Sequence, residues 1–322
     1  MNTVPTFSDD EAVETYLGCL QSQRQFSPHT LASYRRDLAQ LRQLSEGARF
    51  SALTPSHIRR MVSKLHAGGM NPRSIARKLS AWRGFYKWFA EQGTLAINPV
   101  DHIRPPRRKR TLPDALPVDS AIQLVSAQQE VSDAAPDDQL TALCNRAMFE
   151  LLYSSGLRVS ELTGLDRRYV SENGYTSSGW INLDEQEVTV TGKGNKKRAV
   201  PVGQAATDAI RAWLDARDTL MDSRAGDGHA LFVNLHGRRM TPRLVQLRLK
   251  ARARALRLPQ HVHPHMLRHS FASHVLQSSG DLRAVQEMLG HTSIASTQVY
   301  TALDFQHLAK IYDAAHPRAK KR

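Results

Sequence analysis

Three residue types that suit chemistry on a phosphodiester follow one another in two segments near the C-terminus of this 322-residue chain. His265 and Arg268 begin an expected helix that runs to Gly280, and His291 and Tyr300 follow in the next segment. Arginine holds two anionic oxygens in its planar fork, histidine transfers protons near neutral pH, and an activated tyrosine is a nucleophile. Any one of them alone is usually an ordinary core or surface residue, so their joint occurrence carries the prediction.

Two further basic residues lie upstream. Arg158 comes two positions after Gly156, which we expect to end a helix in a left-handed turn, so Arg158 begins the next helix on a rigid support. Lys193 lies between Gly192 and Gly194 at the tip of an expected hairpin. A lysine in a turn is usually just exposed, but glycine on both sides indicates a backbone that approaches another molecule closely.

The ordered set of Arg158, Lys193, His265, Arg268, His291 and Tyr300 resembles the active site of the tyrosine recombinases, the phage integrase family, which type IB topoisomerases share. The resemblance covers nearly the whole chain and is closest to the Xer subfamily. It implies a site-specific recombinase that cuts and rejoins DNA through a 3′-phosphotyrosyl intermediate. It also implies resolution of chromosome dimers at a dif-type site, in a heterotetramer with a XerD-like recombinase, and a septal DNA translocase as a further partner.

Each residue of the set then has an expected role. Arg158 and Arg268 bind the non-bridging oxygens, with a hydrogen bond from His291. Tyr300, whose ordinary pKa is about 10, attacks phosphorus while His265 accepts its proton, and Lys193 protonates the leaving 5′-oxygen. Enzymes that use a metal on phosphodiesters hold it with paired carboxylates. No Asp or Glu cluster accompanies these motifs, so we expect no metal and no cofactor.

The composition favours a polyanionic partner. Lysine and arginine number 44 against 30 aspartates and glutamates, which gives a net charge of +14 and a pI near 10.1. Double-stranded DNA is the commonest such partner, although binding to ribosomes or membrane surfaces would produce a similar charge. Cys19 and Cys144 fall in apolar helices and are expected as free thiols in a reducing cytoplasm. Because we find neither a signal peptide nor an apolar run of membrane-spanning length, we expect a cytoplasmic protein without membrane insertion.

Residues 1–103 are expected to form a helical core-binding domain of the SAM-like type. Four helices are predicted between residues 8 and 93, and their starts are marked by a Ser8–Glu11 capping box and by Pro28, Pro55 and Pro72. The fourth helix carries basic residues between its apolar positions. A solvated basic face is one interpretation, and a helix laid along DNA phosphates is the one we favour; the residues concerned are Arg73, Arg77, Lys78 and Lys87.

Residues 104–115 are expected to form a basic, proline-rich linker. Its prolines exclude a continuous helix, and Arg107 and Arg108 would cross the DNA backbone if the linker follows the duplex. A plain flexible linker is the alternative.

Residues 116–322 are expected to form the catalytic domain, so that the whole is a mainly α two-domain DNA clamp with a small antiparallel sheet (α+β). Three alternating segments at 181–183, 188–190 and 198–200 predict that sheet. A helix from Pro242 carries Arg243, Arg248 and Arg252. Arg248 or Arg252 could read guanine in a major groove. The nearly equal alternative is that these arginines bind DNA phosphates without reading the sequence.

A last helix from Phe305 would pack either on its own domain or on a neighbouring protomer, as in the family. The 171–180 segment looks longer than in close relatives.

Three rival functions share parts of this pattern. A metal-dependent nuclease could use His261, His263 and His265, but the sequence offers no carboxylate companion. A non-catalytic DNA-binding regulator explains the basic helix and leaves Arg158, Lys193, His291 and Tyr300 unexplained. A phage- or mobile-element-type integrase shares the chemistry, and the near-absence of an extra N-terminal arm-binding module argues against it.

Overall fold

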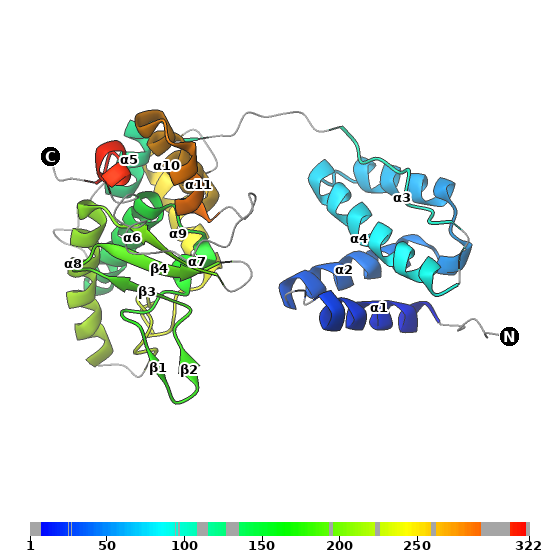
Figure 1. Ribbon diagram of the computed structural model, residues 1–322, viewed down its shortest axis with the longest axis horizontal. Helices are drawn as coiled ribbons and strands as arrows, with labels where there is room; N and C mark the ends of the chain where they lie inside the picture. The colour runs from blue at the N-terminus through cyan, green and yellow to red at the C-terminus, as the bar shows by residue number, and fades with distance from the viewer. Residues whose placement is uncertain are drawn as a thin grey trace. The chain divides into compact units, whose positions relative to one another are not determined.

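The chain folds as two compact units, Met1–Thr111 and Leu112–Arg322 (Figure 1). Each unit has its own hydrophobic core. A computed structural model describes residues 8–24, 26, 28–93, 95, 97–107, 115–126, 135–192, 196–222, 226–258, 262–290 and 310–319. Among these residues no helix has both the length and the apolar character needed to cross a membrane.

The first unit is helical, as predicted. It consists of α1 (Asp9–Arg24), α2 (Pro28–Leu44), a short 3₁₀ turn (Phe50–Ala52), α3 (Pro55–Ala67) and α4 (Pro72–Glu91). The caps follow the sequence signals. The Ser8 amide donates to the Glu11 carboxylate at 2.9 Å while the Glu11 amide donates to Ser8 Oγ at 3.3 Å. Thr54 and Asn71 accept amide hydrogen bonds at the starts of α3 and α4.

Aromatic side chains of α4 hold this unit together. The Phe85 ring lies 5.6 Å from that of Tyr16 on α1, 5.5 Å from Phe50 and 5.4 Å from Phe89. Tyr86 donates its hydroxyl to the Phe50 carbonyl at 3.1 Å. Such rings bury large apolar areas, and their concentration on one helix makes α4 the scaffold of the unit.

The second unit combines helices with short strands. Its elements in chain order are α5 (Val118–Ser126), α6 (Pro136–Ser155), α7 (Val159–Thr163), β1 (Ser171–Glu172), β2 (Tyr175–Thr176), β3 (Gly179–Asn182), β4 (Glu187–Thr191), β5 (Lys197–Pro201), α8 (Gln204–Asp222), α9 (Pro242–Ala255), α10 (Pro264–Ser279) and α11 (Leu282–Leu289). Helix α6 packs against α5, α8 and α10 and is buried on all sides over its last nine residues, 147–155.

The predicted three-stranded antiparallel sheet is confirmed. Strands β3, β4 and β5 pair in that order, with Ile181 opposite Val188 and Val188 opposite Val200. Two features were not predicted. The 171–180 segment contains a two-stranded hairpin, β1–β2, which extends away from the sheet (Figure 1). Helix α8 follows β5 directly and packs along α6.

The described part of the C-terminal segment, residues 310–319, packs on its own unit. Tyr312 is 1% exposed, its hydroxyl lies 2.6 Å from Ser154 Oγ, and its ring stacks on His316 at 4.9 Å. Arg318 pairs with the fully buried Glu150 of α6. Burial lowers the pKa of His316 to about 3, so this imidazole is neutral. Residues 310–315 are helical, whereas Phe305 and the predicted start of the last helix lie outside the described residues.

Candidate active site

Position 156, in the turn between α6 and α7, has to be glycine. Gly156 ends α6 in the left-handed region with φ 56°, and a Cβ on it would lie 2.4 Å from Cδ1 of Phe271 on α10. A side chain at this position would therefore be both strained and sterically excluded. As a result, the turn that leads into α7 can lie against α10, where Arg268 donates to the Gly156 carbonyl, and the positive charge of Arg158 is close enough to act on Arg268.

Arg158 directly precedes α7 as its N-cap residue, as its position after the Gly156 turn predicts. Its side chain is 37% exposed. Its Nη1 donates to Glu161 at 2.8 Å, and its backbone amide donates to the same carboxylate at 2.8 Å. One edge of the guanidinium, at Nη1, is thus held by Glu161, while the partly exposed remainder is accessible to a ligand.

Arg268 lies in α10 and is almost fully buried, at 7% exposure. Its Nη1 donates to the Gly156 carbonyl at 2.6 Å, and its Nη2 donates to the Leu289 carbonyl at 2.5 Å. Burial and the positive charge of Arg158 lower its pKa to about 10, so the group stays charged at neutral pH. A buried cation bonded to neutral carbonyls needs a further negative charge nearby.

His265 is exposed at the start of α10, three residues before Arg268. Burial of part of its ring lowers its pKa, and the nearby charges of His263, Arg268, His269 and Arg158 lower it further. Burial and the neighbouring positive charges together favour the neutral form of His265, which is the form that can accept a proton.

Sequence reasoning missed two residues that complete this cluster, Glu161 and Arg198. Both guanidinium nitrogens Nη1 and Nη2 of Arg198 donate to the Glu161 carboxylate, at 3.0 and 2.9 Å. A signal for Arg198 exists, because it shares strand parity with the buried Val200 and so must point inward. Glu161 follows Arg158 by three positions, the spacing of neighbours on one helix face.

Among the described residues, Arg158 and Arg198 bond one carboxylate, that of Glu161, while Arg268 lies near enough to feel its charge. Burial alone would raise the pKa of Glu161, but hydrogen bonds and charge from Arg198, with further bonds from Arg158, bring it below its ordinary value. The carboxylate is therefore ionised, and the cluster keeps an excess of positive charge. Its chemistry is that of an anion site in which oxygen atoms bearing negative charge are stabilised.

Three residues of the predicted set, Lys193, His291 and Tyr300, lie outside the described residues. Their neighbours in the sequence are described. The Gly192 amide donates to the Lys196 carbonyl at 2.8 Å at the end of the β4–β5 hairpin. Gly290, with φ 65°, ends α11 directly before His291 in the sequence.

Comparison with known proteins settles the family. Residues 123–307 match the model of the phage integrase family, and residues 13–93 match its N-terminal SAM-like domain. The chain belongs to the phage integrase family. It is 54% identical over 319 residues to tyrosine recombinase XerC 1 of Ralstonia nicotianae, covering 96% of this chain and 94% of that protein. It is 47% identical to a tyrosine recombinase XerC of Pseudomonas aeruginosa, covering 96% of both. The chain is accordingly a site-specific DNA recombinase of the tyrosine type.

Solved structures of this family share its fold. The Tn1549 transposon integrase, in complex with transposon right-end DNA, superimposes with a TM-score of 0.68 at 16% identity, covering 93% of this chain and 98% of that one. The XerH site-specific recombinase bound to a palindromic difH substrate gives 0.65 at 19% identity, with 95% and 84% coverage. The mainly α architecture with a small antiparallel sheet is confirmed as that of a tyrosine recombinase.

The predicted DNA-binding face of the recombinase's α4 is partly used internally. Lys78 is 8% exposed, and its Nζ donates to the fully buried Asp37 of α2 at 2.9 Å, because that carboxylate needs a cation. Lys78 therefore belongs to the core and not to the basic face. Arg77 also bonds Asp37 but stays 48% exposed. Arg73, Lys87 and, beyond the helix, Arg107 are exposed, while Arg108 lies outside the described residues.

The basic helix α9 of the recombinase is likewise divided between two faces. Arg248 donates to Asn145 Oδ1 of α6 at 3.2 Å, and burial lowers the pKa of Arg252, whose Nε finds no partner among the described residues. The two arginines that we expected to reach guanine are thus half-buried on the side that faces α6. The exposed side carries Arg243, Gln246, Leu247, Lys250 and Arg254.

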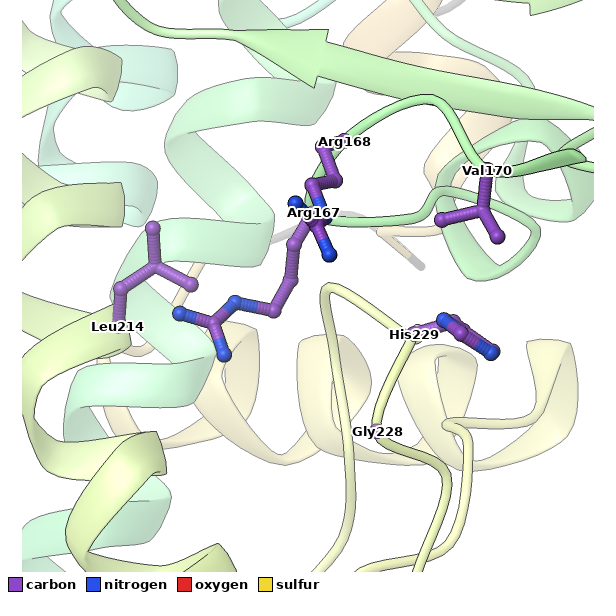
Figure 2. A pocket seen from close by; sticks show the side chains of 6 residues that line it. All are labelled: Arg167, Arg168, Val170, Leu214, Gly228 and His229. Carbon is purple, nitrogen blue, oxygen red and sulfur yellow. The ribbon is translucent and has the colours of Figure 1, made fainter.

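A hollow of about 400 Å³ opens elsewhere on the same unit (Figure 2), lined by Arg167, Arg168, Val170, Leu214, Gly228 and His229. None of these six belongs to the predicted catalytic set. Arg167 is held there by Asp218 at 2.8 Å.

The rival metal site would use three histidines, of which His261 lies outside the described residues. Within the described part of the chain, no three His, Cys, Asp or Glu side chains form a group that could hold a metal ion.

Proposed function

We propose that this recombinase acts at a dif-type site together with a XerD-like partner, exchanges strands in a heterotetramer and so resolves chromosome dimers. The sequence identity of this chain to two proteins named XerC supports the proposal. It is 54% to one and 47% to the other, over nearly the whole length of the chain. A septal DNA translocase is the further partner that we propose. The domain limits 1–103, 104–115 and 116–322 belong to the same proposal.

The excess positive charge around Glu161 is the observation that carries the proposed chemistry. A phosphodiester anion would complete the cluster, with Arg158 and Arg268 on its non-bridging oxygens and His291 as a further donor. These cations would lower the pKa of Tyr300 from about 10, and neutral His265 would take its proton. The bond from phosphorus to the 5′-oxygen would break as Lys193 protonates that oxygen, and the covalent 3′-phosphotyrosine would conserve the energy of the broken bond. A 5′-hydroxyl of another strand can then reverse the step, and the tyrosine regains a proton.

For DNA binding, we propose the exposed sides of α4 and α9. On α9, Arg243, Lys250 and Arg254 would contact phosphates, and Leu247, which is 48% exposed between them, suits the methyl group of thymine. Arg243→Ala should weaken binding to all sequences alike, whereas Leu247→Ala should weaken discrimination at one base pair. Arg252→Ala, on the side that faces α6, is the matched control. If Arg252→Ala alone weakened discrimination between base pairs, Arg252 would be the residue that reads guanine, as the sequence predicted.

The covalent intermediate tests the proposed chemistry. A duplex that carries a dif-type site, nicked near the cleavage position, should trap wild-type protein as an adduct on a denaturing gel. Tyr300→Phe should bind the same duplex with an unchanged dissociation constant and form no adduct. An adduct with Tyr300→Phe would overturn the assignment. Recombination of two dif-type sites only when a XerD-like protein is added tests the partner, and footprinting maps the bound sequence.

A further inference from the structure

Arg198 is a buried cation with an unusually complete set of partners. Its side chain is 5% exposed on β5, where burial of an unpaired charge would be very unfavourable. Nη1 and Nη2 grip the two carboxylate oxygens of Glu161 in the bidentate arrangement, and Nε donates to the Met288 carbonyl of α11 at 3.1 Å. One planar group therefore joins a strand to two helices that are far apart in the sequence.

The contact with Glu161 reaches Arg158 directly. Each oxygen of that carboxylate accepts from both arginines: Oε1 from the two Nη1 atoms, and Oε2 from Arg198 Nη2 and the Arg158 backbone amide. Because the carboxylate is held from both sides, it has little freedom to rotate. The guanidinium of Arg158 then has a fixed position.

The contact with Met288 fixes the end of α11. The last carbonyls of a helix have no partner within the helix, and a cation near them is favourable. Arg198 takes the Met288 carbonyl, while Arg268 takes the Leu289 carbonyl. The space is filled closely, since a Cβ on Gly290 would lie 3.1 Å from Cδ and Nη1 of Arg198. The two arginines thus anchor the point at which the chain proceeds to His291.

We propose that Arg198 is a positioning residue for strand cleavage, which holds Arg158, through Glu161, and the end of α11 in one fixed geometry. The inference rests on the proposed function, because it takes Arg158 and His291 as groups that contact the scissile phosphate. Arg198 itself has its three described bonds directed to protein atoms. A lysine in its place could keep the charge but could not bond both oxygens of Glu161 and the Met288 carbonyl in one plane.

The test compares Arg198→Lys with Arg217→Lys. Arg217 is a matched control, since it is 1% exposed in the same unit and bonds the carbonyls of Ala230, Asp227 and Gly228, outside the catalytic set. With DNA saturating, Arg198→Lys should slow single-turnover adduct formation by about 10²-fold, the loss expected when reacting groups are misplaced by about 1 Å. Its dissociation constant for DNA should stay unchanged. Arg217→Lys should lower the melting temperature with little effect on the cleavage rate of folded protein.

Two further variants separate the possible failures. In a double-mutant cycle, Arg198→Lys combined with Glu161→Gln should be no slower than the worse single variant, because both act through one contact. Additive losses, or a cleavage rate of Arg198→Lys near the wild-type rate, would overturn the inference. Arg158→Lys reports on the proposed function itself. If it cleaves normally, the assignment of the catalytic arginines fails; if it is slow while Arg198→Lys is fast, only the positioning role fails.

Discussion

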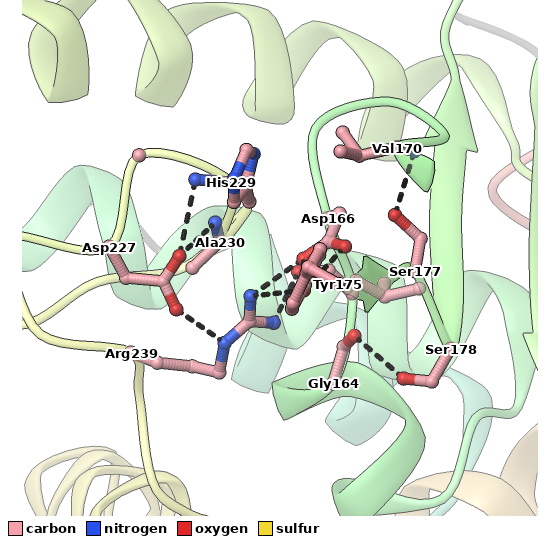
Figure 3. A network of polar contacts seen from close by, with 12 residues as sticks. Gly164, Asp166, Val170, Tyr175, Ser177, Ser178, Asp227, His229, Ala230 and Arg239 are labelled. Atoms are coloured by element: carbon pink, nitrogen blue, oxygen red, sulfur yellow. Dashed lines mark hydrogen bonds and ion pairs between the residues drawn. The ribbon is translucent and has the colours of Figure 1, made fainter. Parts of the chain in front are cut away.

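Two arginine clusters in the second unit differ in their balance of charge. Around Arg158, Arg198 and Arg268, the described contacts include one carboxylate, Glu161. Around Arg167, Arg217 and Arg239 they include three, Asp166, Asp218 and Asp227. Figure 3 shows part of the second cluster, where Arg239 bonds Asp166, Asp227 and the Tyr175 hydroxyl. A balanced cluster is complete as it stands, whereas an unbalanced one is built for an anion from outside.

The largest expected effect contrasts one arginine from each cluster. Arg268→Ala should reduce the rate of adduct formation by about 10³-fold, as for loss of an oxyanion donor. Arg239→Ala should instead reduce the free energy of unfolding by about 3 kcal/mol, because it leaves buried Asp166 without its ion pair. Single-turnover cleavage and denaturant unfolding of both variants measure the difference. Comparable losses of cleavage in the two folded variants would remove the distinction.

A smaller effect concerns the leaving group. Lys193→Ala should slow cleavage by about 10²-fold, since general acid catalysis contributes this much. Alkoxides leave poorly without a proton, whereas a thiol of pKa about 8.5 leaves as thiolate. A substrate with sulfur at the 5′-bridging position should therefore restore cleavage by Lys193→Ala, while Arg268→Ala stays slow. Equal rescue of both variants would mean that Lys193 is a phosphate or base contact, with His265 as the next candidate for the acid.

A third expectation uses the lowered pKa of His265. The neutral imidazole accepts a proton above its pKa, so a lowered pKa extends the active range toward acid. The cleavage rate should be flat near neutrality and fall tenfold per pH unit only below the ordinary value of about 6.5. A rate profile from about pH 5 to 8 checks this. In His265→Asn the fall of the cleavage rate at low pH should disappear. If the rate still falls in that variant, the titrating group is another residue.

The smallest expected effect is none. If guanidiniums supply the charge at the phosphate, cleavage should persist in excess EDTA at its full rate. Loss of activity in chelator, restored by Mg²⁺ or Zn²⁺, would favour the metal-dependent alternative built on His261, His263 and His265.

The sequence predicted best what is local. The Ser8–Glu11 capping box and Pro28, Pro55 and Pro72 predicted the helix starts of the first unit, and strand alternation predicted the three-stranded sheet. Gly156 predicted the turn that presents Arg158. These signals depend on neighbours in the chain, which a sequence shows directly.

What the sequence did not predict depends on distant partners. Lys78 occupies a helix face that reads as basic, and Asp37 of another helix draws it into the core. Arg248 and Arg252 share α9 with exposed cations, and only the packing of α9 on α6 separates the two sides. Arg198 lies in a run of basic residues, and its role depends on Glu161 and Met288. Helix α8 lacked a recognised start signal and was not predicted.

The packing of residues 310–319 has a consequence for synthesis. Tyr312 belongs to the main core of the second unit, and Glu150 in the C-terminal half of α6 has Arg318 as its cation. A nascent chain that has emerged only as far as α11 therefore contains Arg158 and Arg268 in sequence but lacks part of the core that supports them. Since a domain folds as a unit, its native form is completed only once this late segment has left the ribosome.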